Sequence, residues 1–219
     1  MITNPPAGVL FDLDGTLLDT APNMAQALNC LRVEQGLSAL EFAAIRPMVS
    51  HGSRGLIRLG FDLGPEDAGF EPLKKRFLDL YSADLASKAT LFPGMADVLD
   101  HLEGAAIRWG IVTNKPAWLT QPLLQQLNLL ERSACVISGD TTAYAKPHPE
   151  PLFYACRLLK LATDACLYVG DAERDIEAGR RAGMTTIAAR YGYRYSYESP
   201  ESWGADGLID NPLELLRWL

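Results

Sequence analysis

The sequence predicts an α/β fold, because short apolar runs alternate with helical patterns along most of its 219 residues. Strands buried on both faces of a parallel sheet read as continuous apolar runs, whereas amphipathic helices repeat apolar residues three and four positions apart. Runs with strand character occur at residues 8–13, 107–112, 134–137, 166–169, 184–189 and 208–209. Segments with helical spacing between them occur at residues 95–102, 119–127, 151–159 and 176–182. This alternation predicts a Rossmann-like, doubly wound parallel sheet with helices on both faces.

One long segment interrupts the alternation between the first and second predicted strands. About ninety residues separate these strands, whereas the crossovers of parallel sheets are usually short. The segment shows helical apolar spacing, broken by several turn-forming glycines. We therefore predict a core formed by residues 1–18 and 89–219, with an inserted all-helical cap at residues 19–88. A cap rooted at the ligand-binding edge of the sheet is expected to close over the site and exclude water.

The composition is that of a soluble globular protein, with 48% hydrophobic and 21% charged residues. The net charge of -7 and the lack of clustered Lys and Arg argue against a nucleic-acid surface. The apolar stretches fall short of the roughly 20 residues of a membrane-spanning helix, and the first eight residues do not resemble a signal peptide. We expect a cytoplasmic protein with no nucleic-acid or membrane partner. The sequence leaves open whether it is a monomer or a homodimer.

The four cysteines lie far apart, without the close spacing typical of zinc or redox sites. They are Cys30, Cys135, Cys156 and Cys166. Disulfides are disfavoured in the cytosol, so we expect all four to be free, buried thiols.

Two carboxylates follow the first predicted strand. Asp12 and Asp14 are two positions apart, so their side chains leave an extended chain in the same direction and repel each other unless they share a cation or a proton. Mg²⁺ prefers carboxylate oxygens and backbone carbonyls, and it commonly binds substrate phosphate as well. Thr113, Ser138 and Asp171 follow other predicted strands, at the sheet edge where ligands bind. The pattern indicates a cation-assisted site at that edge.

Four short motifs in chain order carry a resemblance to a known family. The sequence DLDGTLLDT at residues 12–20 resembles the first motif of the haloacid dehalogenase superfamily of phosphatases. TNK at residues 113–115 resembles the second motif, and Lys146 followed by proline resembles the third. GDAERD at residues 170–175 resembles the fourth, GDxxxD. Together the motifs span nearly the whole chain outside the predicted cap, which makes the set far more specific than any one motif.

The resemblance implies a Mg²⁺-dependent phosphomonoesterase that hydrolyses a small phosphorylated metabolite through an aspartyl-phosphate intermediate. It implies that Asp12 is the nucleophile and that Asp14 is the general acid and base. Thr113, Asn114 and Lys146 would bind the phosphoryl oxygens, and Lys146 would also offset the charge of the nucleophile.

The resemblance also implies a metal site. Its ligands would be Asp12, the backbone carbonyl of Asp14, Asp171 and Asp175. Whether Asp175 binds the metal directly or supports it from behind stays open, and a helix N-terminal carboxylate is an equally good interpretation of Asp175 taken alone.

The cap is expected to recognise the rest of the substrate. Residues 50–55 combine a flexible backbone, notably at Gly52, with Arg54, whose guanidinium suits a substrate carboxylate. A surface ion pair is an equally good interpretation of Arg54.

Two substrate classes follow from finer likenesses. The layout resembles the phosphoglycolate phosphatase subgroup, with its helical cap directly after the first motif. The stretches VTNKP, KPHPEP, YGY and WGAD resemble the N-acetylmuramic acid 6-phosphate phosphatases of bacterial cell-wall recycling. Both substrates carry a carboxylate and a phosphate, so Arg54 suits either. The tyrosines at 191, 193, 195 and 197 fit a sugar-facing cluster or, more simply, a packed loop.

The residue two positions after the nucleophile distinguishes phosphatases from other enzymes of the superfamily. Dehalogenases and phosphonatases typically lack an acid there, and this chain retains Asp14, which favours phosphate esters. A sugar-phosphate phosphatase or a mutase stays open. A catalytically idle binding module is disfavoured, because such a module has no reason to retain Asp12, Asp14, Lys146 and Asp171.

Overall fold

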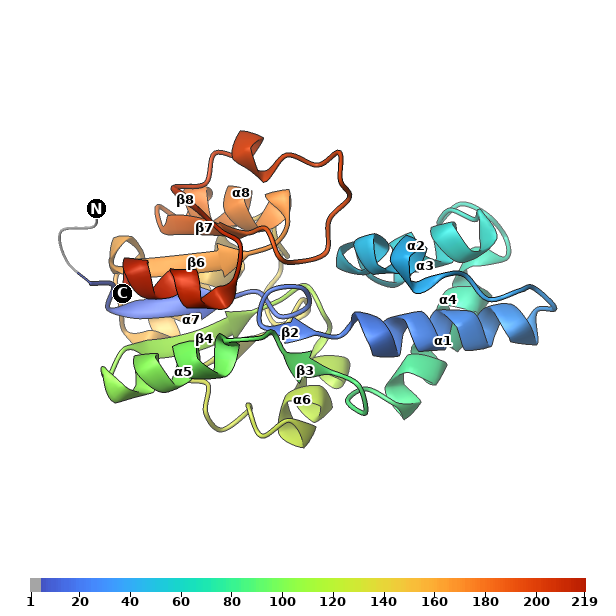
Figure 1. Cartoon of the computed structure of the whole chain (residues 1–219), viewed down its shortest axis with the longest axis horizontal. Helices are drawn as coiled ribbons and strands as arrows, with labels where there is room; N and C mark the ends of the chain where they lie inside the picture. Colours follow the sequence, from blue (N-terminus) through green and yellow to red (C-terminus); the bar gives the residue numbers. More distant parts are fainter. Residues whose placement is uncertain (1–4) are drawn as a thin grey trace.

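In the computed structural model, which describes residues 5–219, six strands form one parallel sheet in the order β5-β4-β1-β6-β7-β8 (Figure 1). They are β1 (Gly8–Phe11), β4 (Arg108–Val112), β5 (Val136–Ile137), β6 (Cys166–Gly170), β7 (Thr185–Ala189) and β8 (Gly207–Ile209). Each predicted strand is present, with bounds that differ by at most two residues at either end. The predicted α/β fold class is therefore confirmed.

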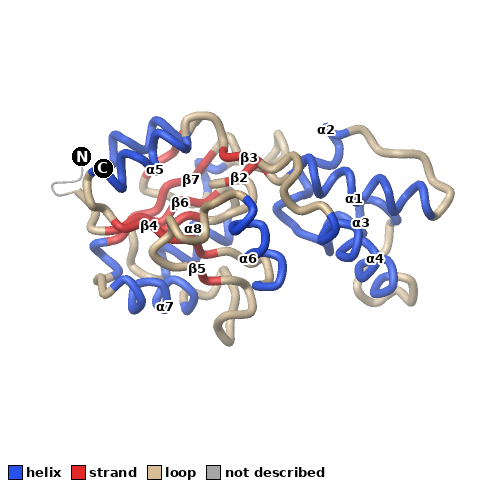
Figure 2. Tube along the Cα trace, turned by 90° about the horizontal axis from the view of Figure 1, so that it is seen from below, coloured by secondary structure: helices blue, strands red, loops and turns tan. Residues whose placement is uncertain are grey.

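Helices cover both faces of the sheet, as Figure 2 shows for α5 and α7. The helices of the core are α5 (Met95–Gly104), α6 (Ala117–Gln126), α7 (Glu150–Leu159) and α8 (Glu173–Arg181). Side chains alternate along β1, so that Val9 and Phe11 pack with α5 and α6, whereas Leu10 packs with α7 and α8. The apolar runs of the sequence follow from this burial on two faces.

Short 3₁₀ helices complete the core. They are η2 (Thr163–Ala165), η3 (Pro200–Ser202) and η4 (Pro212–Trp218). The segment at the end of the chain, η4, lies against α5 and buries Leu215 in the same cluster as Val9. Within residues 5–219, the helices are too short or too polar to cross a bilayer.

The order of the strands places β1, and therefore its carboxyl end, near the centre of the sheet. From β1 the chain continues to β4 and β5 on one side, then returns to β6, β7 and β8 on the other. Ligands of doubly wound sheets bind where the direction of winding reverses, which here is the carboxyl end of β1. Asp12 is the first residue beyond that end.

The helical cap lies beyond this edge of the sheet, on the right in Figure 1. Its helices are α1 (Ala21–Glu34), α2 (Phe42–Ile45), η1 (Arg46–His51), α3 (Gly52–Phe61) and α4 (Phe70–Ala83). Leu28, Leu31, Leu56 and Phe77 are fully buried and give the cap an apolar core continuous with that of the main domain. The all-helical character matches the prediction.

A two-stranded antiparallel ladder, which the sequence analysis did not predict, joins the cap to the core. It pairs β2 (Leu18–Asp19) with β3 (Thr90–Leu91), so the chain enters and leaves the cap side by side. We propose that this ladder is the boundary between the predicted core, 1–18 and 89–219, and the predicted cap, 19–88. Residues 1–4 of that core lie outside the described residues.

Cys30 corrects the expectation that all four thiols are buried. It lies on the outer face of α1 and is exposed, whereas Cys135, Cys156 and Cys166 are buried beside the sheet. The helix turns its buried face, with Leu28 and Leu31, toward the cap core, and Cys30 falls on the opposite side. All four cysteines are free.

We expect one thiol per folded chain to react with a maleimide, and four after denaturation. Burial raises the pKa of Cys135 to about 12, and a buried thiol is also inaccessible to the reagent. Intact mass spectrometry counts the adducts, and Cys30→Ser serves as the control that should remove the native adduct. Rapid modification of two or more thiols in the folded protein would contradict this arrangement.

Candidate active site

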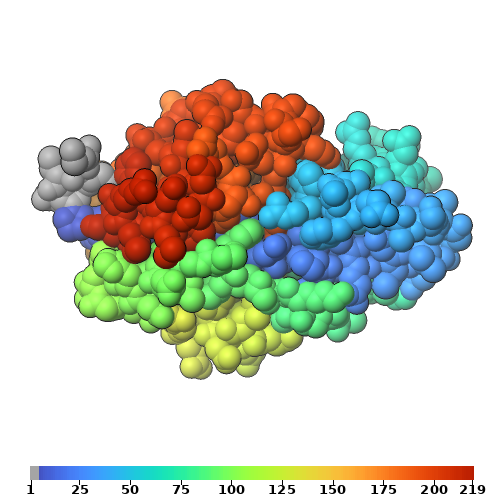
Figure 3. All heavy atoms as spheres, viewed as in Figure 1, coloured from blue at the N-terminus to red at the C-terminus, as the bar shows by residue number. Residues whose placement is uncertain are grey.

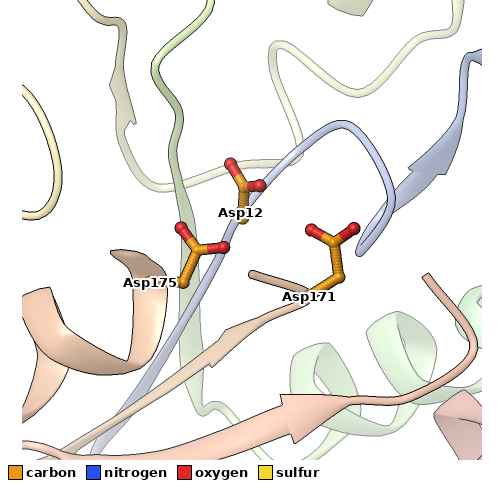
Figure 4. Close-up of side chains that lie close together, drawn as sticks. All are labelled: Asp12, Asp171 and Asp175. Carbon is orange, nitrogen blue, oxygen red and sulfur yellow. The ribbon is translucent and has the colours of Figure 1, made fainter. Parts of the chain in front are cut away.

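Three carboxylates converge at the centre of the sheet edge. Asp12 follows β1, Asp171 follows β6, and Asp175 lies in the first turn of α8, and all three side chains are buried. One oxygen from each lies within 4.8 Å of the others, and Figure 4 shows the three carboxylates around a common space. Burial raises the pKa of Asp12 above its ordinary value. Burial and the charges of Asp12 and Asp175 raise the pKa of Asp171 to about 7.

The donor set fits a hard divalent cation. Carboxylate oxygens are the preferred ligands of Mg²⁺ and Ca²⁺, and repulsion among buried carboxylates is relieved by a shared positive ion. The hydroxyl of Ser50, in the cap, donates a hydrogen bond to Asp171 Oδ2 at 2.9 Å and adds another oxygen to the group. No histidine or cysteine belongs to the cluster among residues 5–219, which argues against a site for a softer metal.

The Lys146 ammonium supplies a positive charge from within the protein. Its Nζ lies 2.8 Å from Asp12 Oδ1 and 2.7 Å from Asp175 Oδ1. It also lies 2.8 Å from the carbonyl oxygen of Val112 and 2.8 Å from the hydroxyl of Tyr168. Asp175 Oδ2 accepts the backbone N–H of Ala172 at 3.1 Å. Both Asp175 oxygens are thus engaged by the protein, which suits a supporting role behind the metal.

Asn114 holds the backbone of Lys146. Its side-chain amide donates to the Lys146 carbonyl at 2.9 Å, and its Oδ1 accepts the Lys146 N–H at 3.0 Å. Both ends of the amide are therefore occupied, although the sequence analysis expected this side chain to bind phosphate. Thr113, the other predicted phosphate ligand of this motif, is buried at the end of β4 and lines the cavity.

The Asp14 carboxylate lies outside the group of three converging carboxylates. It accepts hydrogen bonds from Thr20 Oγ1 at 2.5 Å and from Lys115 Nζ at 3.1 Å. The same ammonium donates to the Tyr81 hydroxyl on α4 at 2.7 Å. Burial lowers the pKa of Lys115, but Asp14 and Tyr81 outweigh this effect, so the pKa is raised. Lys115 therefore stays charged and joins the core to the cap.

Gly15 lets the loop that carries Asp12 and Asp14 approach Asp171. Its φ of +94° is in the left-handed region, and a Cβ at this position would lie 2.2 Å from Asp171 Oδ2. A larger residue would displace the carboxylate.

A cavity of about 570 Å³ separates the core from the cap. The core contributes Asp12, Asp14, Thr113 and Arg174 to its lining, and the cap contributes residues 50–54. The predicted cap residues Gly52 and Arg54 therefore do face the site. In Figure 3 the blue surface of the cap meets the orange-red surface of the C-terminal part of the core. The predicted site residues thus meet at one place, although they come from opposite ends of the chain.

Comparison with known proteins assigns the family. Residues 9–189 match the model of the haloacid dehalogenase-like hydrolases. The chain belongs to this family. Its relatives include the N-acetylmuramic acid 6-phosphate phosphatase of Pseudomonas putida, which is 47% identical over 95% of this chain and 94% of the relative. The phosphoglycolate phosphatase of Xanthomonas campestris is also 47% identical, over 96% of this chain and 95% of its own.

Solved structures of the family share the whole architecture. The crystal structure of a predicted phosphoglycolate phosphatase from Haemophilus somnus superposes with a TM-score of 0.86, at 25% identity, over 98% of both chains. The resemblance drawn from the four motifs is therefore confirmed. Phosphatases of this family generally use a divalent metal, and the three converging carboxylates provide a suitable group of ligands.

Tyr193 connects the sheet edge that carries the three carboxylates to the base of the cap. Its hydroxyl accepts the backbone N–H groups of Thr20 at 2.6 Å and Ala21 at 2.9 Å, and it donates to Asp19 Oδ1 at 2.7 Å. Its own backbone N–H donates to Asp171 Oδ2 at 2.8 Å. One buried residue therefore contacts both the ladder that leads into the cap and a predicted metal ligand.

Arg46 fastens the cap to the same loop. Its guanidinium donates to the carbonyl oxygen of Gly192 at 3.0 Å and lies 4.9 Å from the centre of the Tyr193 ring. The sequence analysis predicted no role for Arg46, Tyr81 or Lys115 in the site. Their partners lie far along the chain, so only a three-dimensional arrangement or covariation among relatives reveals these contacts.

We expect Tyr193→Phe to lower the free energy of unfolding by about 1–3 kcal/mol. The change leaves the N–H group of Thr20 buried without its acceptor, and leaves the N–H group of Ala21 with only its longer hydrogen bond to Asp19 Oδ1, at 3.3 Å. Urea unfolding measures the loss. Tyr191→Phe is the matched control, because its hydroxyl makes one hydrogen bond, to the carbonyl oxygen of Thr16, and its loss should be about 1 kcal/mol or less. Equal losses in the two variants would show that the Tyr193 hydroxyl contributes no more to stability than the Tyr191 hydroxyl.

Proposed function

We propose that this protein is a Mg²⁺-dependent phosphomonoesterase that acts on a small phosphate ester carrying a carboxylate. The Asp12–Lys146 contact is the observation that carries the proposal. Lys146 holds Asp12 Oδ1, whereas Asp12 Oδ2 accepts no hydrogen bond from residues 5–219. A buried carboxylate that lines the cavity with one oxygen free is suitably placed to attack phosphorus.

Asp12 and Asp14 divide the chemistry. The free oxygen of Asp12 forms the new O–P bond while the bond from phosphorus to the ester oxygen breaks. Asp14 lines the same cavity and donates a proton to the departing alcohol. Asp14 then takes a proton from a water molecule, which attacks the phosphorus and releases phosphate from Asp12. Thr113 and Lys146 hold the phosphoryl oxygens, and Asn114 keeps Lys146 in position.

Asp12, Asp171 and the backbone carbonyl of Asp14 would hold the Mg²⁺, with Asp175 supporting them. When bound, the cation neutralises charge on the transferring phosphoryl group. Ser50 orients Asp171 from the cap side, and the Tyr193 N–H orients it from the core side. The metal ligand is thus fixed by both parts of the protein.

The cap supports a substrate that carries a second anionic group. Arg54 is exposed at the wall of the cavity, and its guanidinium makes no ion pair within residues 5–219. Phosphoglycolate and N-acetylmuramic acid 6-phosphate both supply a carboxylate. The cavity volume of about 570 Å³ lies in the range, roughly 300–1,000 Å³, that encloses a drug-sized ligand. This volume favours the sugar acid over the two-carbon phosphoglycolate.

We expect phosphate release to require Mg²⁺ and to fall about a thousandfold or more in Asp12→Asn, equal to about 4 kcal/mol of barrier. The amide is a poor nucleophile of nearly the same shape, so the fold should be retained. Phosphate release in the presence of Mg²⁺ or EDTA measures both effects. Asp97→Asn, an exposed carboxylate of α5, is the control that should retain full turnover. Wild-type turnover in Asp12→Asn would overturn the proposed mechanism.

We expect kcat/KM for N-acetylmuramic acid 6-phosphate to exceed that for N-acetylglucosamine 6-phosphate, which lacks the carboxylate, and that for phosphoglycolate. Arg54→Ala should lower kcat/KM about tenfold for the two acids and leave the ester without a carboxylate nearly unchanged. Arg58→Ala, one turn further along α3 and outside the cavity, is the matched control. An equal effect of Arg54→Ala on all three esters would show that Arg54 does not recognise the carboxylate.

A further inference from the structure

Arg174 is a cation of the active site that the mechanism above does not use. It lies in the first turn of α8, between Asp171 and Asp175 in the sequence, and it lines the cavity beside Asp12. Its guanidinium forms no hydrogen bond or ion pair with residues 5–219, and its Nε is buried without a partner. A guanidinium has five N–H donors, and buried donors are nearly always satisfied. An unpaired arginine in a cavity therefore points to an anionic ligand.

The surroundings of Arg174 place this ligand at the reacting end of the cavity. Asp175, Asp12 and Asp171 raise the pKa of Arg174 against the effect of burial, so these carboxylates are its charged neighbours on the core side. On the cap side, burial and the charge of Arg174 lower the pKa of His51. Arg174 also lines the same cavity as Asp12 of the core and His51 of the cap.

Charge balance gives a reason for a second cation. Asp12, Asp171 and Asp175 carry three negative charges when ionised, and Lys146 offsets one of them. A divalent cation offsets the remaining two, so an arriving phosphate dianion meets a site with no surplus positive charge. Lys146 already has close contacts with two carboxylates, a carbonyl and a hydroxyl, whereas the donors of Arg174 are unused. Arg174 therefore has unused donors that can receive phosphoryl oxygens in addition to Thr113 and Lys146.

We propose that Arg174 binds the non-bridging oxygens of the phosphoryl group and stabilises the charge that it carries during transfer to and from Asp12. The inference rests on the proposed phosphatase function. The guanidinium contributes N–H groups in a fork that matches two phosphoryl oxygens, and it keeps its proton throughout. Arg54, on the cap, is left to recognise the substrate carboxylate. The two arginines thus divide the two anionic groups of the substrate between them.

The test compares Arg174→Gln, Arg174→Lys and the control Arg157→Gln, an exposed arginine of α7 outside the cavity. We expect Arg174→Gln to lower kcat/KM about 10- to 100-fold, equally for N-acetylmuramic acid 6-phosphate and N-acetylglucosamine 6-phosphate. Arg174→Lys should recover part of the loss, because it retains the charge without the fork. A loss confined to the ester with the carboxylate, or a change below twofold, would overturn the proposal.

Calorimetric titration with inorganic phosphate and Mg²⁺ tests the same contact without turnover. We expect Arg174→Gln, and not Arg157→Gln, to weaken phosphate binding about tenfold or more, with thermal unfolding confirming that each variant is folded. If Arg174→Gln is unfolded, phosphate affinity is compared between Arg174→Lys and the wild type instead, and we expect a smaller loss of affinity. If the wild type hydrolyses no ester and the Arg174 variants bind phosphate more weakly than the wild type, the proposed function is refuted and the phosphate contact of Arg174 is retained. Unchanged phosphate affinity, or no phosphate binding by the wild type, would overturn it.

Discussion

Charge compensation around Asp12 constrains the rest of the structure. Three carboxylates within 4.8 Å of one another, all buried, repel each other and cost several kcal/mol each unless positive charge lies among them. Lys146 supplies part of that charge, and its position depends on Asn114, which holds its backbone from the neighbouring strand end. The parallel sheet makes this possible, because it brings strand ends that are far apart in sequence to one edge. The fold and the charge balance are therefore parts of the same arrangement.

Residues at the carboxyl edge of the sheet also contact the cap and fix its position relative to the core. Asp171 receives a hydrogen bond from Ser50 on the cap and another from the Tyr193 backbone, so a predicted metal ligand is contacted from both sides. Lys115 makes a comparable link between Asp14 and Tyr81 of the cap. A movement of the cap therefore alters the surroundings of both carboxylates at once. In the proposed mechanism, the closed position of the cap excludes water from these carboxylates.

The sequence was sufficient for the sheet and the helical cap, and it placed the predicted site residues at one edge of the sheet, because each of these rests on a local pattern. Apolar runs follow from burial of strands on two faces, and Asp12, Lys146 and Asp171 sit in short motifs at strand ends or loops. The contacts that the sequence did not reveal join distant positions. Lys115 and Asp14 are 101 residues apart, and Tyr193 and Thr20 are 173 apart, with no local pattern to pair them. Cys30 was misplaced for a related reason, since its exposure depends on which helix face packs inward.

Arg174 shows why such a site is hard to interpret from motifs alone. In the sequence it occupies one of the unspecified positions of GDxxxD, where the exposed side of a helix is its simplest position. In the structure α8 packs against β6 and β7, and Arg174, which lies between Asp171 and Asp175 in the sequence, lines the cavity. In the proposed mechanism the core presents the cations Lys146 and Arg174 to the phosphoryl group, while the cap presents Arg54 to the substrate carboxylate. Changes in the cap can thus alter which ester is chosen without disturbing the charges that act on phosphorus.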